Sequence, residues 1–236
     1  NAAGGYSQYG MRPVGLLAWA YVTGGHRDEP GSGGETAADR RNDAALRFLR
    51  SFAQKHDIRR MEAFESTFGS NQTASGPFFV GKQQMVVTGP WIAQFIDRYA
   101  PEGFQYGAFP FPAPPGGRAN CTSLNASVFV IPATARHKKE AWVFLNWFLS
   151  PEQNRRFCLA INSGSPLKAV TASREMQAQP LLRLSAKIAG GPNAFGAPEM
   201  PIWPTYLAAI GRAEDQAVHG GGDPQALLQG VQRQME

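Results

Sequence analysis

The segment from Phe78 to Trp91 is the most informative about the fold, because its sequence pattern changes at Gly89 from that of a strand to that of a helix. Residues 84–88 are predicted to form a strand, which ends at Gly89 because Pro90 is typical of the first turn of a helix. Trp91 is the first large side chain of that helix. A strand that turns directly into a helix forms a concave site, where free backbone N–H groups lie beside an apolar ring. This combination favours binding of a hydroxyl-rich molecule over covalent chemistry.

The composition is that of a globular chain with many turns. The 236 residues are 43% hydrophobic and 17% charged, which is enough for one large or two small domains with a real core. The 26 glycines and 18 prolines indicate turns and long loops, but are too few for a disordered chain. No run of 18 apolar residues is present, and the first residues lack the pattern of a signal peptide. Any targeting signal is therefore expected outside this sequence.

The charge and the cysteines exclude several classes of function. The net charge is +5, but no basic stripe is interleaved with aromatic residues, so solvated helix faces are favoured over nucleic-acid binding. Cys121 and Cys158 have no metal-ligand spacing, and they are expected to form either one disulfide or two buried thiols. No metal and no cofactor is predicted.

No catalytic residue is predicted either. The segment from Gly76 to Lys82 matches most of a P-loop, but Gln83 stands where that motif needs Ser or Thr, and the segment precedes a strand. The four histidines lie outside recognisable nucleophile or metal motifs. Carboxylate pairs such as Glu62 and Glu65 lie on helix faces predicted to be solvated.

Turn residues and apolar periodicity together predict a mixture of helices and short strands, and so an α/β fold. The expected helices span residues 13–23, 36–56, 62–68, 77–80, 90–99, 136–149, 150–160, 180–189, 204–218 and 224–235. The expected strands span residues 84–88, 104–109 and 125–131.

Aromatic side chains carry the remaining functional signal. Trp91 and Trp203 each stand beside a proline at an element boundary, a place more typical of a surface or cleft than of a core. A ligand role is favoured for Trp91, whereas ligand binding and packing are equally consistent with Trp203 and Tyr206. A core position is favoured for Trp19 and Tyr21.

The motif that ends at Trp91, together with the segments that follow it, resembles the extracellular solute-binding proteins of carbohydrate ABC importers, the maltose-binding-protein group. The central motif is Phe79, Gly81, Lys82, Met85, Gly89, Pro90 and Trp91. In the same order follow a Phe-Pro-x-Pro turn with Gly116–Gly117, then the segments 125–132, 137–145, 150–152 and 164–166. The resemblance covers nearly the whole chain.

The resemblance implies a type II periplasmic-binding-protein-like fold, in which two α/β lobes close around a sugar. Residues 1–121 and 172–236 would belong to the second, C-terminal lobe. Residues 122–171 would be a hinge-crossing segment of the first lobe, most of which is absent from this sequence. The chain is therefore interpreted as a C-terminal fragment.

The resemblance also implies a set of ligand-binding residues. Trp91 matches the stacking tryptophan of the family, and it follows Gly89 and Pro90. The late aromatic positions and the polar residues near the hinge complete the predicted set, which is Trp91, Gly89, Pro90, Trp203, Tyr206, Asn125 and Ser127.

The function predicted in this way is non-enzymatic capture of a sugar or oligosaccharide, outside the cytoplasm and at the membrane, for delivery to an ABC import permease. One alternative is a non-sugar solute, either a polyamine or an organic anion. An organic anion could bind at the helix start at Pro90 together with Arg12. A carbohydrate-active enzyme is less favoured, because it needs two carboxylates that face one cleft. The apolar segment 137–149 would lack its native partner, and it is expected to associate with another chain.

Overall fold

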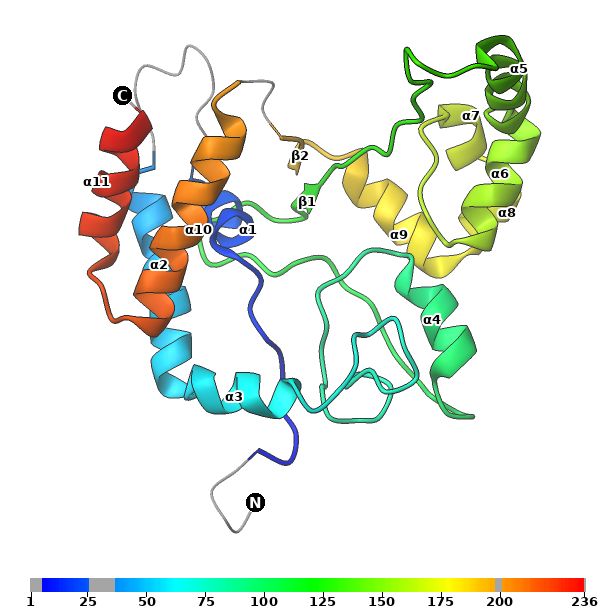
Figure 1. Ribbon diagram of the computed structural model, residues 1–236. Helices are drawn as coiled ribbons and strands as arrows, with labels where there is room; N and C mark the ends of the chain where they lie inside the picture. The colour runs from blue at the N-terminus through cyan, green and yellow to red at the C-terminus, as the bar shows by residue number, and fades with distance from the viewer. Residues whose placement is uncertain (1–5, 26–36, 198–200, 236) are drawn as a thin grey trace.

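The computed structural model describes residues 6–25, 37–197 and 201–235 (Figure 1). Most of its regular structure is helical, and its strands are two residues long. The elements are α1 (Leu16–Val22), α2 (Arg40–Lys55), α3 (Ile58–Glu65), α4 (Ile92–Tyr99), β1 (Thr122–Ser123), α5 (Lys138–Phe148), α6 (Pro151–Ala160), α7 (Lys168–Thr171), α8 (Arg174–Ala178), α9 (Pro180–Ala189), β2 (Ala194–Phe195), α10 (Trp203–His219) and α11 (Pro224–Met235).

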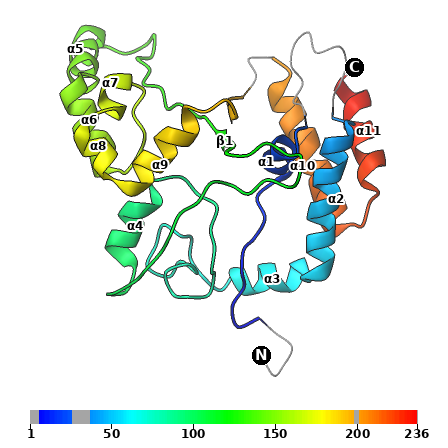
Figure 2. The ribbon, with the colours of Figure 1, turned by 180° about the vertical axis from the view of Figure 1, so that it is seen from behind.

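The helices form two groups on either side of the short β1–β2 pair (Figure 1, and from behind in Figure 2). Helices α1, α2, α10 and α11 lie on one side, and helices α5 to α9 on the other. The two strands are parallel, with Thr122 opposite Ala194 and Ser123 opposite Phe195. The pair therefore joins two segments that are far apart in the sequence.

The first group encloses the main core, because one face of each of its helices is apolar at the helical period. Helix α2 is capped by Asp39, whose carboxylate accepts a 2.6 Å hydrogen bond from the amide of Arg41. The largest fully buried side chains of this core come from α1, α2, α10 and α11. They are Leu16, Leu46, Tyr206 and Leu228.

The second group has a smaller core between α6 and the helices that follow it. Its buried side chains are Cys158, Val170, Met176 and Leu182. The buried amide of Asn154 accepts a 2.5 Å hydrogen bond from the hydroxyl of Ser165, which in turn accepts one from the amide of Leu167. This chain of bonds fixes the turn between α6 and α7.

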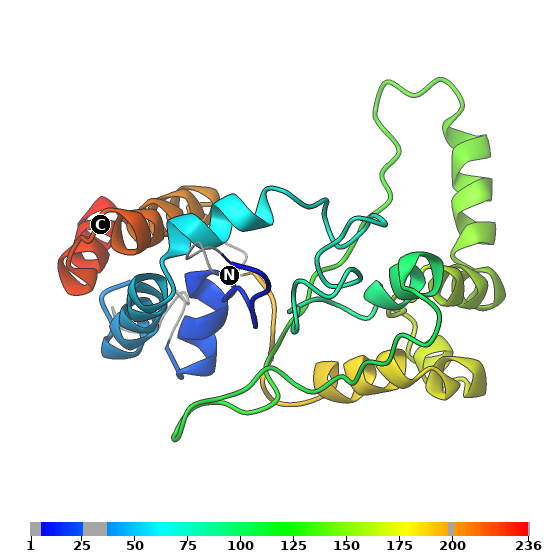
Figure 3. The ribbon, with the colours of Figure 1, turned by 90° about the horizontal axis from the view of Figure 1, so that it is seen from below.

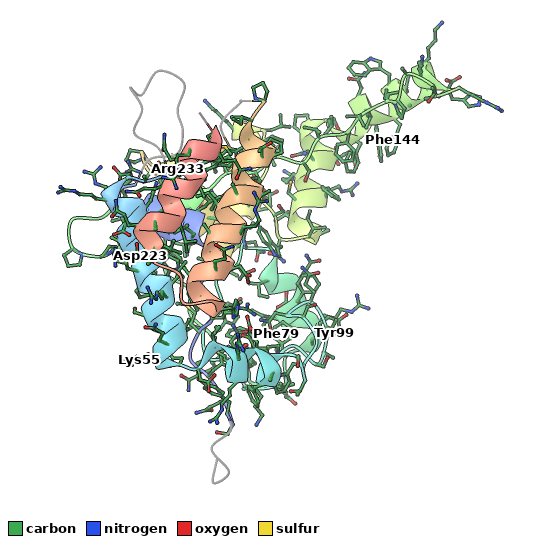
Figure 4. The ribbon with its side chains drawn as sticks, turned by 60° about the vertical axis from the view of Figure 1, so that its left-hand side comes forward. Lys55, Phe79, Tyr99, Phe144, Asp223 and Arg233 are labelled. Carbon is green, nitrogen blue, oxygen red and sulfur yellow. The ribbon has the colours of Figure 1, made fainter. Side chains whose placement is uncertain are left out.

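Helix α4 packs on the loop that precedes it. Phe79, Ile92 and Ile96 are buried together, and Leu181 of α9 lies against them. Figure 4 labels Phe79 and Tyr99 close together in this region, and their ring centroids are 6.4 Å apart. The amide of Gln94 also donates to the carbonyl of Ile161, so α4 is tied to the second group.

Helix α5 projects from the body of the protein and touches α6, where the ring centroids of Phe148 and Phe157 are 5.0 Å apart. It has no buried residue, and Figure 4 shows Phe144 on a helix that projects from the body. Figure 3 shows the same helix, in green, at the end of an extended stretch of chain. Its most exposed apolar side chains are Trp142, Val143, Phe144 and Trp147, each more than half exposed.

The strands expected at 84–88, 104–109 and 125–131 are not formed. Near the first of them the chain makes a single bridge, between Tyr9 and Gln83. A strand exists only where a second backbone pairs with it, and alternating side chains do not reveal that partner. The expected helix at 77–80 is a series of turns, and the short helices α7 and α8 were not predicted. The other expected helices are confirmed: those at 180–189 and 224–235 have the predicted ends, and the ends of the rest are shifted.

Candidate ligand-binding site

Trp91 lies at the surface where α4 begins. It is the N-cap residue of the helix, with φ −58° and ψ −16°, and it is 44% exposed. The amides of Ile92 and Ala93 donate 3.2 Å hydrogen bonds to the carbonyls of Gly89 and Pro90. The predicted turn into a helix is therefore present, although no strand leads into it.

The segments before and after α4 add other exposed apolar side chains. Met85 and Tyr106 are both 44% exposed, and Val87 is 40% exposed. Burial of its hydroxyl and the nearby charge of Asp97 raise the pKa of Tyr106. Tyr106 is not among the site residues predicted from the sequence, because it lies inside the expected strand 104–109. Its position next to Gly107 was the signal of an irregular segment.

Trp203 and Tyr206 lie together at the start of α10. Their rings stack with centroids 5.5 Å apart and planes 22° from parallel. Tyr206 is only 1% exposed and belongs to the main core, whereas Trp203 is half-buried against that core. Tyr206 also lines a small hollow, together with Leu16, Leu17, Ala20, Tyr21, Gly25, Asn42 and Ile210.

Tyr21 is the other aromatic residue of that hollow, and it connects α1 to β2. Its ring lies 3.9 Å from the ring of Phe195, centroid to centroid. The guanidinium carbon of Arg118 is 4.5 Å from the centre of the Tyr21 ring. Arg118 also donates hydrogen bonds to the carbonyls of Tyr21 and Gly25, at 3.3 and 3.1 Å. Tyr21 is half-buried at this junction, whereas Trp19 is buried in the core as the sequence predicts.

Asn125 and Ser127 are exposed in the segment that follows β1. The amide of Leu124 donates a 2.6 Å hydrogen bond to the carbonyl of Phe195, and this extends the β1–β2 pairing. The side-chain amide of Asn125 donates to the hydroxyl of Ser123 at 3.2 Å. The predicted site residues thus lie in three places: the start of α4, the start of α10 and the segment after β1.

The charged groups considered for other functions are engaged elsewhere. Arg12 forms ion pairs with Glu62 and Glu65, both at 2.8 Å.

Within the described residues, no group of three or more His, Cys, Asp or Glu side chains could hold a metal ion. None of the described helices is long and apolar enough to cross a bilayer. Cys121 and Cys158 are free, buried thiols, which decides between the two alternatives that the sequence left open.

Comparisons with known proteins point to one family. A model of the family described as bacterial extracellular solute-binding protein matches residues 4–183. A protein of Brucella abortus biovar 1 that is named as a binding protein is 28% identical over 152 residues. The match spans 64% of this chain and 36% of that protein.

Two solved structures share the fold. CpMnBP1 with mannobiose bound has a TM-score of 0.76 and is 22% identical, over 92% of this chain and 55% of that one. Maltose-bound MalE3 of T. maritima has a TM-score of 0.78 and is 18% identical, over 99% of this chain and 61% of that one. The fold is therefore that of a type II periplasmic binding protein, and this chain spans little more than half of each solved chain.

Proposed function

Because this chain belongs to the bacterial extracellular solute-binding protein family, we propose that it takes part in the capture of a sugar or oligosaccharide for an ABC import permease. The role is one of binding and delivery, without covalent chemistry. It is exercised outside the cytoplasm, as the description of the family implies.

The half-exposed indole of Trp91 carries this proposal. A flat apolar ring at the surface, next to a helix start, can stack on the apolar face of a sugar while polar groups bind its hydroxyls. The likeness to structures with mannobiose and maltose bound supports the same class of ligand.

The other predicted residues have narrower proposed roles. Asn125 and Ser127 are exposed, and they offer an amide and a hydroxyl to a ligand at the segment after β1. Trp203 offers the exposed part of a half-buried ring. Tyr206 supports that ring from the core, so its proposed contribution passes through the stacked Trp203.

We also propose a division of the chain into lobes, by its resemblance to the family. Residues 1–121 and 172–236 form the second lobe, and residues 122–171 are the part that crosses to the first lobe. The exposed apolar face of α5 supports the assignment of that helix to the missing lobe, because an apolar face is normally buried against another element. Met176 and Leu182, by contrast, share a core with Cys158 and Val170 across the proposed boundary at residue 171. The same face is proposed to mediate self-association of the chain.

The alternative of an organic anion is less well supported. Arg12 was its cationic candidate, but two carboxylates already neutralise that guanidinium. A polyamine would need acidic groups around Trp91, and the nearest acidic residue of α4 in sequence is Asp97.

Ligand-observed NMR on the 236-residue chain tests the proposal. Maltose and mannobiose are offered at millimolar concentration, because one lobe with few contacts is expected to bind with a Kd of about 1 mM or weaker. We expect saturation transfer from protein to sugar, lost in Trp91→Ala and kept in Trp142→Ala, since Trp142 is an exposed tryptophan of α5. Transfer to putrescine or citrate, with none to either sugar, would refute the proposed ligand class.

A further inference from the structure

The indole of Trp91 occupies the space that a side chain at residue 89 would need. A Cβ on Gly89 would lie 1.9 Å from Cζ3 of Trp91, 2.2 Å from Cη2 and 2.3 Å from Cε3. Carbon atoms repel strongly when they come much closer than about 3.5 Å. The six-membered half of the indole therefore rests directly on the backbone of Gly89.

The backbone at this point does not itself require glycine. The glycines of the described residues with left-handed φ values are Gly24, Gly81, Gly103, Gly116 and Gly221, and Gly89 is not among them. The φ of residue 89 therefore does not itself exclude an alanine. The contact that excludes a side chain is the one with the Trp91 ring.

The chain around the ring is also rigid. Pro90 fixes its own φ near −65° and restricts the residue before it. Trp91 already has helical backbone angles, and the carbonyls of Gly89 and Pro90 accept hydrogen bonds from the first turn of α4. A side chain at residue 89 would thus be accommodated by rotation of the indole about its own side-chain bonds.

We propose that Gly89 is a positioning residue, whose missing side chain lets the Trp91 indole lie flat on the backbone and present its opposite face to the ligand. The inference rests on the proposed function for its ligand, but the orientation of the ring can be measured without one. This packing also limits how many sugar rings can stack on the Trp91 indole. With one face of the ring covered by Gly89, the indole stacks on a single sugar ring and cannot be sandwiched between two.

The orientation can be followed by fluorine NMR of the protein labelled with 5-fluorotryptophan, in which the fluorine is bonded to Cζ3. The resonance of Trp91 is assigned as the one missing from Trp91→Phe. In Gly89→Ala we expect this resonance to move, while those of the other four tryptophans, Trp19, Trp142, Trp147 and Trp203, keep their positions. An unmoved Trp91 resonance in a folded Gly89→Ala protein overturns the proposal.

Gly107→Ala is the matched control. Gly107 lies in the irregular segment after α4, and a Cβ there would meet nothing within 4 Å. We expect every fluorine resonance of this variant to match the wild type.

A second measurement covers the case in which Gly89→Ala does not fold. In the wild-type chain, the α-hydrogen that a Cβ would replace points at the indole and should be displaced by its ring current. Trp91→Ala should return the Gly89 α-proton to an ordinary chemical shift. Equal shifts in the two proteins contradict the packing of the ring on Gly89.

Sugar binding separates this inference from the proposed function. Loss of a well-placed stacked ring is worth about 0.5–1.5 kcal/mol, or about a two- to tenfold loss of affinity. Gly89→Ala should therefore weaken maltose or mannobiose binding by this factor, and Gly107→Ala should leave it unchanged. If neither sugar binds the wild type, the proposed function fails, and the fluorine and proton shifts still decide the position of the ring. If sugar binds Gly89→Ala as tightly as the wild type, the positioning role fails.

Discussion

The backbone amide of Leu16 donates a 2.8 Å hydrogen bond to the carboxylate of Glu214. Leu16 is the first residue of α1, and the residue before it, Gly15, has no side chain with which to cap the helix. Glu214 comes from α10, so a distant helix supplies the missing cap and ties the two ends of the sequence together.

Removal of this cap should lower the stability of the chain. We expect Glu214→Ala to reduce the free energy of unfolding by about 1–2 kcal/mol, because it leaves the amide of Leu16 without its acceptor. Glu214→Gln keeps an acceptor oxygen and should lose less. The measurement is urea unfolding followed by circular dichroism. Asp215→Asn, at an exposed neighbouring carboxylate, is the control, and an equal loss in all three variants would contradict the capping role.

Tyr9 should make stability fall at alkaline pH. Burial of its hydroxyl, followed by the hydrogen bond and negative charge of Glu65, raises the pKa of Tyr9 far above its ordinary value of 10.0. The folded chain then keeps a proton that the unfolded chain loses, so the stabilisation is complete below about pH 10 and is lost as the pH rises further.

The pH slope of the unfolding free energy measures this effect. Above pH 10, ionisation of Tyr9 in the unfolded chain should lower the free energy of unfolding by up to about 1.4 kcal/mol per pH unit. Tyr9→Phe should remove this part of the decline while it keeps the ring packing on Phe64. The two proteins are compared by urea unfolding between about pH 9 and pH 11. Identical slopes would show that Tyr9 ionises in the folded chain as it does when unfolded.

The two cysteines should react slowly with thiol reagents while the chain is folded. Burial raises the pKa of Cys121 and of Cys158, and the buried thiols donate to nearby acceptors, such as the carbonyl of Arg118 for Cys121. We expect labelling by Ellman's reagent to be about tenfold or more slower than in urea, where two thiols per chain should be counted. Fewer than two thiols in urea without reductant would indicate an oxidised pair.

The apolar face of α5 should drive self-association. Replacing both Trp142 and Phe144 by serine should shift sedimentation towards the monomer, because it removes two exposed aromatic rings of a helix with no buried residue. The free energy of unfolding should change by no more than about 0.5 kcal/mol. Leu207→Ser, at an exposed apolar residue of α10, is the control and should leave the association state unchanged. A double variant that sediments like the wild type would locate the contact elsewhere.

The helices were predictable because their signals are local. Asp39 and Asp223 precede α2 and α11 and bind their first amides, and such caps are visible in the sequence. The same is true of Pro151 and Pro180 at the first positions of α6 and α9.

The strands were not predictable, because pairing is not local. The segment 125–131 has the β-branched and aromatic residues of a strand, yet nothing pairs with it in the described structure. The actual strands, β1 and β2, are too short to show any alternation.

The position of Trp91 at the surface followed from its place after Gly89 and Pro90, whereas the packing of its ring on Gly89 needed coordinates. The burial of Tyr206 could have been read from the sequence. Tyr206, Ile210, Ala213 and Ala217 recur at the helical period and form the buried face of α10.

The main core is shared by two distant halves of the chain, since Leu16 and Leu46 come from the first and Tyr206 and Leu228 from the second. The turn that separates them is exposed at Pro115 and Gly116, and the next anchored residue, Arg118, binds the end of α1 from the far side of that turn. A cut after residue 115 therefore leaves every one of these contacts in place. Two separately expressed pieces, 1–115 and 116–236, should recognise each other and reassemble without a covalent link.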